Sequence, residues 1–287
     1  MVGMASTPYF TQHDRTWQNN VYVYPVISRR SGGLSIGVNL NPDKACNFDC
    51  VYCQVDRTVA PTVREVDPRR LRDELERTVR AAVSGELFTD PHFRDVPAAY
   101  RRISDIAFSG DGEPTTSPLF GEAVHIAADI RQTFNLPDLK LVLITDAAYL
   151  TKPAVRAALA VMDANNGEIW AKLDAGTEEY YQLINRPNVP LQTVLDNILD
   201  AAKVRPVVIQ SLWMKVHGQP PPLAEIDAFA RCLQDILRAG GQIRLVQVYT
   251  IARRTTEPFV TPLEESDLQA IADRVQAVTQ VPVTIYT

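Results

Sequence analysis

The stretch KACNFDCVYC, residues 44–53, holds three of the four cysteines of the chain, Cys46, Cys50 and Cys53, within eight residues. Soft thiolates crowded in this way favour a metal, and the short spacing lets one loop reach three corners of an iron–sulfur cube. A cubane cluster usually has four cysteine ligands. No fourth ligand lies nearby in the sequence, so one iron would stay open. The alternatives are a disulfide with one odd thiol, a structural zinc site, and three unliganded buried cysteines.

The segment CNFDCVYC, residues 46–53, resembles the cluster loop of the radical S-adenosylmethionine (SAM) superfamily. The resemblance implies that Cys46, Cys50 and Cys53 bind a [4Fe-4S] cluster. It further implies that SAM binds the fourth iron through its amino and carboxylate groups. Tyr52, the aromatic residue before the last cysteine, would then lie beside the adenine of SAM.

The composition of the 287-residue chain, 46% hydrophobic with a net charge of -5, is that of a globular protein with a large core. We expect a single domain over 1–287, with an N-terminal extension (1–33), a core barrel (34–250) and a C-terminal helix and strand (251–287). The sequence pI of about 5.5 favours no extended nucleic-acid surface. The basic pairs, such as Arg253 and Arg254, are typical of solvated surface, although the last pair could also bind an anionic substrate.

Hydropathy along the chain shows no apolar run of about eighteen residues, and the first residues lack the layout of a signal peptide. We therefore expect no membrane association and a cytoplasmic location, where a reducing environment keeps thiols free for metal. Cys232 lies among apolar residues at helical spacing and is expected in the core.

Strand-like and helix-like patterns alternate from residue 34 to residue 250. The apolar, β-rich segments predict a parallel sheet covered by helices. The first helix is expected from Asp67, as N-cap, to about Ser84, and the next begins with Ser117 as N-cap. The predicted fold is α/β, a partial (β/α)6 TIM-like barrel with helices outside a parallel sheet, as in the radical SAM core. The predicted strands of the core are 34–40, 104–110, 139–145, 168–174, 207–213 and 242–250.

The loop after the second core strand, SGDGEP at residues 109–114, combines glycines with a carboxylate. Glycines let the backbone approach a ligand closely, and a carboxylate can hold an ammonium group. By itself the segment could be only a turn. After the cysteine loop it resembles the Gly-Gly-Glu motif of the family. The resemblance implies a site for the SAM amino group, built from Ser109, Gly110, Asp111, Gly112 and Glu113.

Polar residues on later strands are further candidates for SAM contacts. Thr145 and Asp146 end the third strand, at a position that often contacts SAM in the family. Lys172 and Asp174 alternate on the fourth, and so point to one face of the sheet. They could form a structural ion pair, but contact with the SAM carboxylate or ribose is the preferred interpretation. Gln210 on the fifth strand is a similar candidate.

The segments FSGDGEPT and LDAGTEEYYQLINRP resemble the branch of wyosine-type tRNA synthases and related iron–sulfur oxidoreductases. Wyosine synthases carry a second cluster before the SAM motif, whereas residues 1–45 here contain no cysteine. Chemistry that needs a second cluster, and a tRNA substrate, are therefore not expected.

The resemblance implies an enzyme that cleaves SAM reductively at the [4Fe-4S] cluster. The resulting 5′-deoxyadenosyl radical would abstract hydrogen from an unidentified substrate. A reductant such as flavodoxin or ferredoxin would supply the electron, and the substrate is a small molecule or RNA. No residue is assigned to catalysis on the substrate. The alternatives are a tRNA base-modifying enzyme of the wyosine type and a non-catalytic iron–sulfur electron-transfer partner, although a pure carrier would more naturally have four cysteine ligands.

Overall fold

The computed structural model describes residues 17–287, so the expectation about the first residues lies outside the described part of the chain. The chain divides into two compact units. The first comprises the residues up to Cys46, Ala60–Ile144 and Pro153–Glu168, and the second comprises Asn47–Val59, Thr145–Lys152 and Ile169–Thr287.

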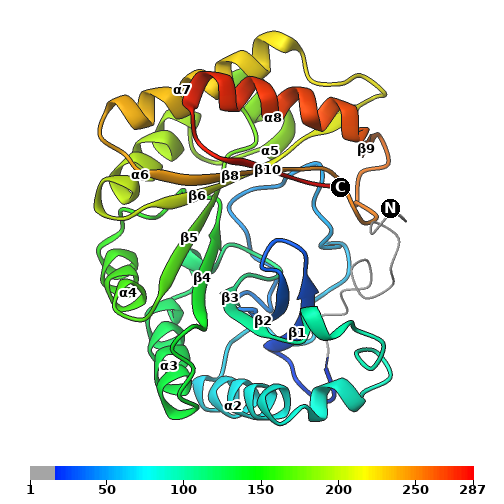
Figure 1. Ribbon diagram of the computed structural model, residues 1–287, viewed down its shortest axis with the longest axis vertical. Coiled ribbons are helices and arrows are strands. Elements are labelled where there is room, and N and C mark those ends of the chain that lie inside the picture. The colour runs from blue at the N-terminus through cyan, green and yellow to red at the C-terminus, as the bar shows by residue number, and fades with distance from the viewer. Residues whose placement is uncertain (1–16) are drawn as a thin grey trace. The chain divides into compact units, whose positions relative to one another are not determined.

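The strands of the first unit follow one another in the order β1-β2-β3-β4. The first two pair antiparallel and the others join in parallel, with Val38 beside Phe108 and Asp105 beside Lys140. In Figure 1 the helices of this unit lie around the outer side of these strands. Its elements are β1 (Val23–Ser28), β2 (Gly33–Val38), α2 (Pro68–Ser84), η2 (Glu86–Thr89), η3 (Ala98–Tyr100), β3 (Ile103–Phe108), η4 (Pro114–Thr116), α3 (Phe120–Thr133), β4 (Lys140–Thr145) and α4 (Pro153–Asp163).

Helix α2 shows how local sequence sets the elements of this unit. The Asp67 side chain accepts a hydrogen bond from the backbone N–H of Arg69 at 2.9 Å, and Pro68 occupies the first turn, where its missing N–H costs nothing. Gly85 ends the helix with a φ of 82°, a left-handed conformation that suits glycine. The helix packs its apolar face against β1 and β2.

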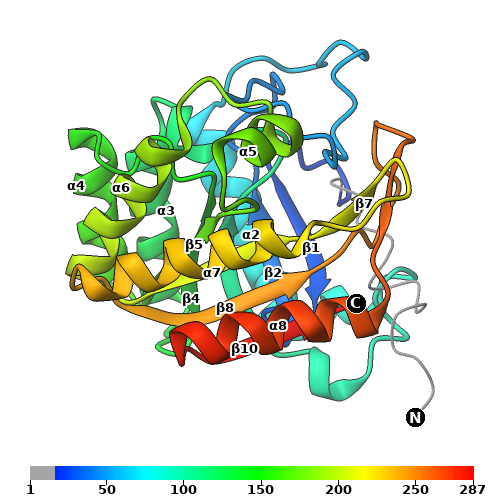
Figure 2. The same cartoon turned by 90° about the horizontal axis from the view of Figure 1, so that it is seen from above.

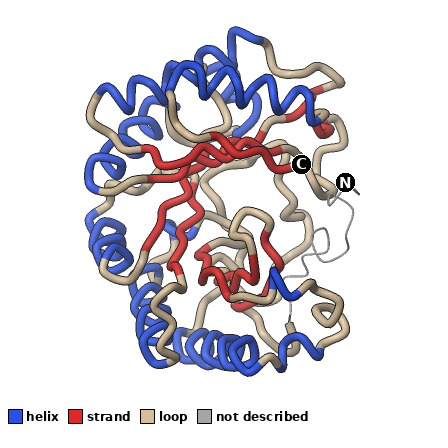
Figure 3. Tube along the Cα trace, in the orientation of Figure 1, coloured by secondary structure: helices blue, strands red, loops and turns tan. Residues whose placement is uncertain are grey.

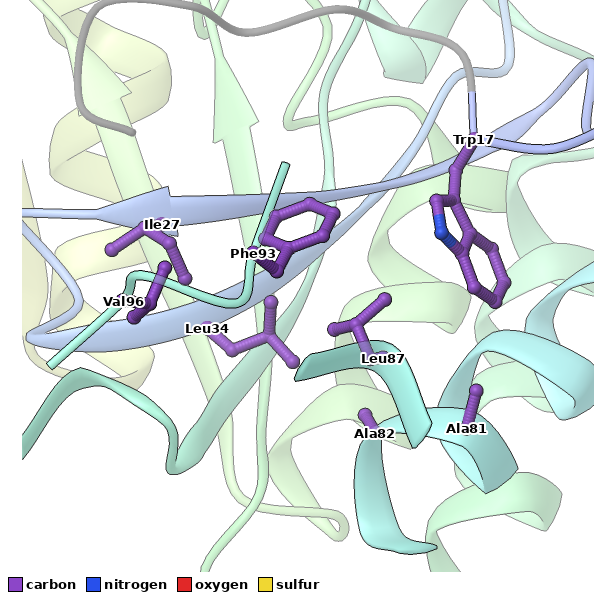
Figure 4. Close-up of a cluster of buried hydrophobic side chains, with 8 residues drawn as sticks. All are labelled: Trp17, Ile27, Leu34, Ala81, Ala82, Leu87, Phe93 and Val96. Carbon is purple, nitrogen blue, oxygen red and sulfur yellow. The ribbon is translucent and has the colours of Figure 1, made fainter. Parts of the chain in front are cut away.

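A cluster of buried apolar side chains fills the space between α2, the segment after it and the first two strands (Figure 4). Burying such side chains contributes roughly 1.5–3 kcal/mol for each large residue. This core fixes β1 and β2 on the helix. Its members are Trp17, Ile27, Leu34, Ala81, Ala82, Leu87, Phe93 and Val96.

The larger group of strands in the second unit is parallel and follows the order β5-β6-β8-β10, and β7 and β9 form a separate antiparallel pair. Helices α7 and α8 pack side by side, and α8 also covers β8 and β10 (Figures 2 and 3). The elements are β5 (Gly167–Lys172), α5 (Glu178–Asn185), α6 (Leu191–Val204), β6 (Val207–Leu212), β7 (Met214–Val216), α7 (Leu223–Arg238), β8 (Ile243–Tyr249), β9 (Val260–Pro262), α8 (Glu265–Thr279) and β10 (Val283–Tyr286).

Most predicted elements are present within a residue or two of their expected limits, and three details differ. Helix α3 begins at Phe120, so Ser117 is not its N-cap. Its hydroxyl accepts from the N–H of Leu119 at 3.3 Å, before the helix starts. Strand β5 ends at Lys172, which leaves Asp174 just beyond it. The antiparallel pair β7 and β9 was not predicted, because each strand is only three residues long. Among residues 17–287, no helix has both the length and the apolar character to span a bilayer.

Candidate functional site

The three clustered cysteines have free thiols, and each is partly buried. The fourth, Cys232, is also free, so the disulfide alternative is wrong. Cys232 is only partly buried on α7, and its thiol lies 3.5 Å from the carbonyl oxygen of Gly176. Within the described residues, no three His, Cys, Asp or Glu side chains converge on a site for a single ion.

The cysteine loop is held in the second unit by the end of α5. The N–H groups of Asp49 and Val51 donate to the carbonyl oxygens of Asn185 and Ile184 at 3.1 and 2.9 Å. Carbonyls in the last turn of a helix have no partner within the helix, so they are available for this purpose. Farther along the loop, the N–H of Thr256 donates to the carbonyl of Cys53 at 3.0 Å.

A buried carboxylate, Asp174, connects this loop to the strands. One oxygen accepts from the backbone N–H of Leu212 at 2.8 Å. The other accepts from the hydroxyl of Tyr52 and from the side-chain amide of Asn185, at 3.1 Å for the latter. The ammonium of Lys172 lies 3.6 Å from the same oxygen. The structure thus contains the structural ion pair considered as the alternative; direct contact of these two side chains with SAM stays a prediction.

The ammonium of Lys172 has two further neighbours. It lies 4.8 Å from the ring centroid of Tyr52, and 3.1 Å from the hydroxyl of Tyr249. Burial is the largest single influence and lowers the pKa of Lys172, but Asp174, Tyr249 and Cys50 together outweigh it, so the pKa of the lysine is raised. The lysine is therefore a fixed cation beside the aromatic ring that is predicted to face adenine.

The groups around Cys50 change the pKa of its thiol. Burial raises the pKa of the Cys50 thiol to about 12, although the ammonium of Lys172 and the amide of Asn185 act in the opposite direction. The side-chain nitrogen of Asn185 lies 3.4 Å from this sulfur. A metal that displaces the proton would therefore leave a thiolate already facing a cation and an N–H donor.

A row of polar side chains crosses the sheet of the second unit. Lys172, Gln210, Gln247 and Thr284 are register partners on adjacent strands, and so share one face. The amide of Gln210 donates to Gln247 at 2.8 Å. The side-chain oxygen of Gln210 is buried and has no hydrogen-bond partner among the described residues. Gln210 thus keeps one acceptor on a polar face, as expected of a ligand contact.

Thr145 and Asp146 form the turn that follows β4. Their side-chain oxygens accept from the backbone N–H groups of Ala147 and Ala148 at 3.0 and 2.9 Å. The side chain of Asn197 donates to the carbonyls of the same two alanines, which holds the turn on α6. Both predicted residues are buried and shape the backbone locally.

The glycine-rich loop of the first unit, residues 109–114, is held in place by side chains from other segments. The side-chain amide of Asn39 donates to the carboxylate of Asp111 at 2.7 Å, and its oxygen accepts from the N–H of the same residue. The hydroxyls of Ser109 and Tyr24 lie 3.2 Å apart. A side chain at Gly112 would place Cβ 1.9 Å from the carbonyl oxygen of Ala45. Glycine is therefore required there, directly against the start of the cysteine loop.

Glu113 ends this loop as a buried carboxylate. One oxygen accepts from the N–H of Thr115 at 3.0 Å and from its hydroxyl at 2.5 Å. It thereby caps the short helix η4. Only 3% of Glu113 is exposed, so the carboxylate occupies a low-dielectric environment where a cation would be bound strongly.

Further buried polar atoms around the cysteine loop have no hydrogen-bond partner among the described residues. They are both side-chain atoms of Asn47, the side-chain oxygen of Asn185 and the hydroxyl of Tyr181. The ring of Tyr181 packs edge-on against Phe48 in this loop. Buried polar atoms are normally satisfied, so these are groups that a polar ligand would complete.

Sequence reasoning missed three residues of this arrangement, Asn185, Gln247 and Tyr249. Asn185 lies in the segment quoted for its resemblance to one branch of the superfamily, directly before Arg186 and Pro187. Arg186 has a left-handed φ of 42°, and Pro187 forms a bridge with Phe48. The proline signals the end of the helix, but nothing in the sequence indicates that Asn185 meets a cysteine 135 residues away. Of the basic pair considered for an anionic substrate, Arg254 is exposed and Arg253 is partly buried.

Comparison with protein families gives a match to the Radical SAM superfamily over residues 40–233. A UPF0026 protein of Methanocaldococcus jannaschii is 30% identical over 179 residues, which cover 61% of this chain and 46% of that protein. A UPF0026 protein of Helicobacter pylori is 24% identical over 182 residues, 63% of this chain and 51% of that protein.

A protein of Brachyspira hyodysenteriae named GTPase Obg is 24% identical over 252 residues, 85% of this chain but only 32% of that protein. The present sequence contains no P-loop motif GxxxxGK[ST]. The chain thus spans about a third to a half of the curated relatives that it matches.

The solved structures that resemble the chain include the following two. Streptococcus suis SuiB bound to S-adenosylmethionine has a TM-score of 0.57 at 13% identity, over 90% of this chain and 49% of that chain. An archaeal TYW1 has a TM-score of 0.50 at 11% identity, over 91% and 85%. This likeness confirms the predicted α/β fold of the partial TIM-like barrel type, with helices outside a parallel sheet.

Proposed function

Because the chain belongs to the radical SAM superfamily, we propose that it is an enzyme in which Cys46, Cys50 and Cys53 hold a [4Fe-4S] cluster. The bound cluster would pass an electron from a flavodoxin- or ferredoxin-like reductant to SAM, giving methionine and a 5′-deoxyadenosyl radical that abstracts hydrogen from a substrate. The family match over residues 40–233, which includes all three free thiols, carries this proposal.

The donor set fits such a cluster. Three soft sulfurs in one loop are the ligands that iron–sulfur clusters use. The loop backbone is anchored by the end of α5, and the partnerless polar atoms of Asn47 and Asn185 provide groups that a polar ligand would complete. The role of the protein is to hold the sulfurs, orient SAM and keep water away from the reacting centre.

The glycine-rich loop is proposed to hold the amino group of SAM. Glu113 is a buried carboxylate with the charge that an ammonium requires, and Gly112 allows close backbone approach. Tyr52 is proposed to lie beside adenine. The ammonium of Lys172 lies 4.8 Å from the centroid of the Tyr52 ring. The presence of this cation would limit the orientations that the adenine can adopt beside the ring.

The remaining proposed SAM contacts differ in how much bonding capacity they keep. Gln210 has a free buried acceptor. Thr145 uses its hydroxyl, and Asp146 one of its two carboxylate oxygens, on their own turn. Lys172 and Asp174 bind each other, and would act on SAM through their combined charge and through the orientation of Tyr52.

Anaerobic reconstitution with iron and sulfide, followed by SAM and a strong reductant, tests the proposal. We expect 5′-deoxyadenosine and methionine by chromatography, together with bound iron. Each of Cys46→Ser, Cys50→Ser and Cys53→Ser should lose product formation by at least about a thousandfold, the scale on which removing a group essential to catalysis acts. Cys232→Ser, which alters the one cysteine outside the loop, is the matched control and should retain it.

Two results would contradict the proposal. A full complement of iron without 5′-deoxyadenosine would favour a cluster carrier. Unchanged iron content in every loop variant would show that these thiols are not ligands.

A further inference from the structure

Asn185 is the last residue of α5, and its side chain is almost fully enclosed, with 2% exposure. Its backbone carbonyl accepts a hydrogen bond from the N–H of Asp49, which attaches the end of α5 to the cysteine loop. Its side-chain nitrogen lies 3.4 Å from the sulfur of Cys50. This is an N–H···S contact between a fixed donor and a proposed cluster ligand.

The orientation of the amide follows from its other neighbours. The same nitrogen lies 3.1 Å from a carboxylate oxygen of Asp174, and 3.3 Å from the hydroxyl of Tyr52. Tyr52 already donates its proton to Asp174. If the amide were flipped, two acceptor oxygens would face each other, so the nitrogen must point to the carboxylate and the sulfur.

The donors at Cys53 are different in kind. Arg57 lies 3.2 Å from that sulfur, but the contact is exposed. The backbone N–H of Val55 is 3.5 Å away. An exposed hydrogen bond competes fully with water, whereas the partly buried contact at Cys50 is shielded from it. Of these side-chain contacts, the one at Cys50 is therefore expected to have the larger effect.

We propose that Asn185 is a positioning residue that raises the reduction potential of the cluster by donating its N–H to the sulfur of Cys50. The inference rests on the proposed function. A hydrogen bond to a ligating sulfur withdraws electron density and so stabilises the reduced cluster. The amide is held in place by Asp174, which makes the donor permanent rather than occasional.

The test is a redox titration of the reconstituted protein, followed by electron paramagnetic resonance. In Asn185→Leu, which has a similar volume and no donor, the ratio of reduced to oxidised cluster at a fixed potential should fall about tenfold, equal to about 59 mV for one electron. The signal of the reduced cluster should also shift. Asn185→Gln, which keeps the N–H donor, should recover at least half of the lost ratio.

Asn197→Leu is the matched control, because Asn197 is a buried asparagine of the same unit whose amide donates to Ala147 and Ala148. It should leave the potential unchanged even if stability falls. If Asn185→Leu does not take up iron, Asn185→Ser is used instead, because its hydroxyl is too short to reach the sulfur. We expect the same fall in the ratio of reduced to oxidised cluster.

An unchanged potential in Asn185→Leu, or in Asn185→Ser where that variant replaces it, with an intact cluster overturns this inference alone. An equal shift in Asn197→Leu also overturns it, because the effect would then be one of general loosening. A wild-type protein that assembles no reducible cluster overturns the proposed function as well.

Discussion

Two buried carboxylates, Glu113 in the first unit and Asp174 in the second, satisfy their charge in different ways. Glu113 binds Thr115, two residues away, and thereby shapes its own turn. Asp174 pairs with the nearby Lys172, but it also binds Asn185, Leu212 and Tyr52, which are 11, 38 and 122 residues away. The bonds of Glu113 to Thr115 build a loop, whereas the distant bonds of Asp174 tie several elements together.

Replacing Asp174 should have the largest effect on stability. Asp174→Ala leaves the Lys172 ammonium, whose side chain is 21% exposed, without its carboxylate, and also removes the acceptor of the Leu212 N–H. Breaking a buried ion pair on one side costs about 3–5 kcal/mol. Urea denaturation measured by circular dichroism should show this loss.

The double variant Asp174→Ala/Lys172→Met removes the stranded charge and is the control. It should be more stable than Asp174→Ala alone. If Asp174→Ala lowered the free energy of unfolding by less than about 1 kcal/mol, the Lys172–Asp174 pair would be no stronger than a weak surface ion pair. The contrast with Glu113 would then be lost.

Gly112 tests how tightly the first-unit loop is built. In Gly112→Ala the new Cβ meets a backbone carbonyl oxygen at 1.9 Å, so the loop must shift. We expect a loss of about 1–3 kcal/mol, the usual cost of overpacking, together with weaker SAM binding by calorimetry.

Gly121→Ala is the matched control, because Gly121 lies in α3 and a Cβ there meets nothing within 4 Å. It should gain roughly 0.5–1 kcal/mol from helix propensity. Equal behaviour of the two variants would show that the approach to Ala45 is not a constraint.

Glu113 should show the smallest effect on stability and a separate effect on binding. Glu113→Ala removes the cap of η4 and should cost about 1 kcal/mol. Glu113→Gln keeps an acceptor for Thr115, and so should preserve stability while lowering SAM affinity about tenfold by loss of charge. Calorimetric titration with SAM, combined with urea denaturation, separates the two. Unchanged affinity in Glu113→Gln would rule out the ammonium role.

Local signals predicted much of this architecture. The sequence predicted the first helix from Asp67, as N-cap, to about Ser84, and α2 runs from Pro68 to Ser84 with Asp67 as its N-cap. The Ser-Pro signal at Ser117 failed because the chain first forms the turn of η4, which delays α3 to Phe120. Where a cap and its helix are adjacent, the sequence is sufficient; where another turn intervenes, it is not.

In the candidate site too, continuous sequence motifs were found from the sequence, whereas contacts between distant residues were not. The cysteines and the glycine-rich loop are continuous motifs, and the alternation of Lys172 and Asp174 correctly indicated that they lie together. The contact of Asn185 with Cys50 joins residues 135 positions apart, and the pairing of Gln210 with Gln247 depends on the register of two strands. Such contacts follow from the three-dimensional fold, which no local pattern specifies.

The central claim, that three thiols hold four irons and leave one iron for SAM, is tested most directly by Mössbauer spectroscopy of the anaerobically reconstituted protein. The account predicts about four irons and four sulfides per chain, the content of one cubane cluster, with the signal of a single iron changing when SAM is added. Zinc in place of iron, or a spectrum that SAM does not alter, would contradict it.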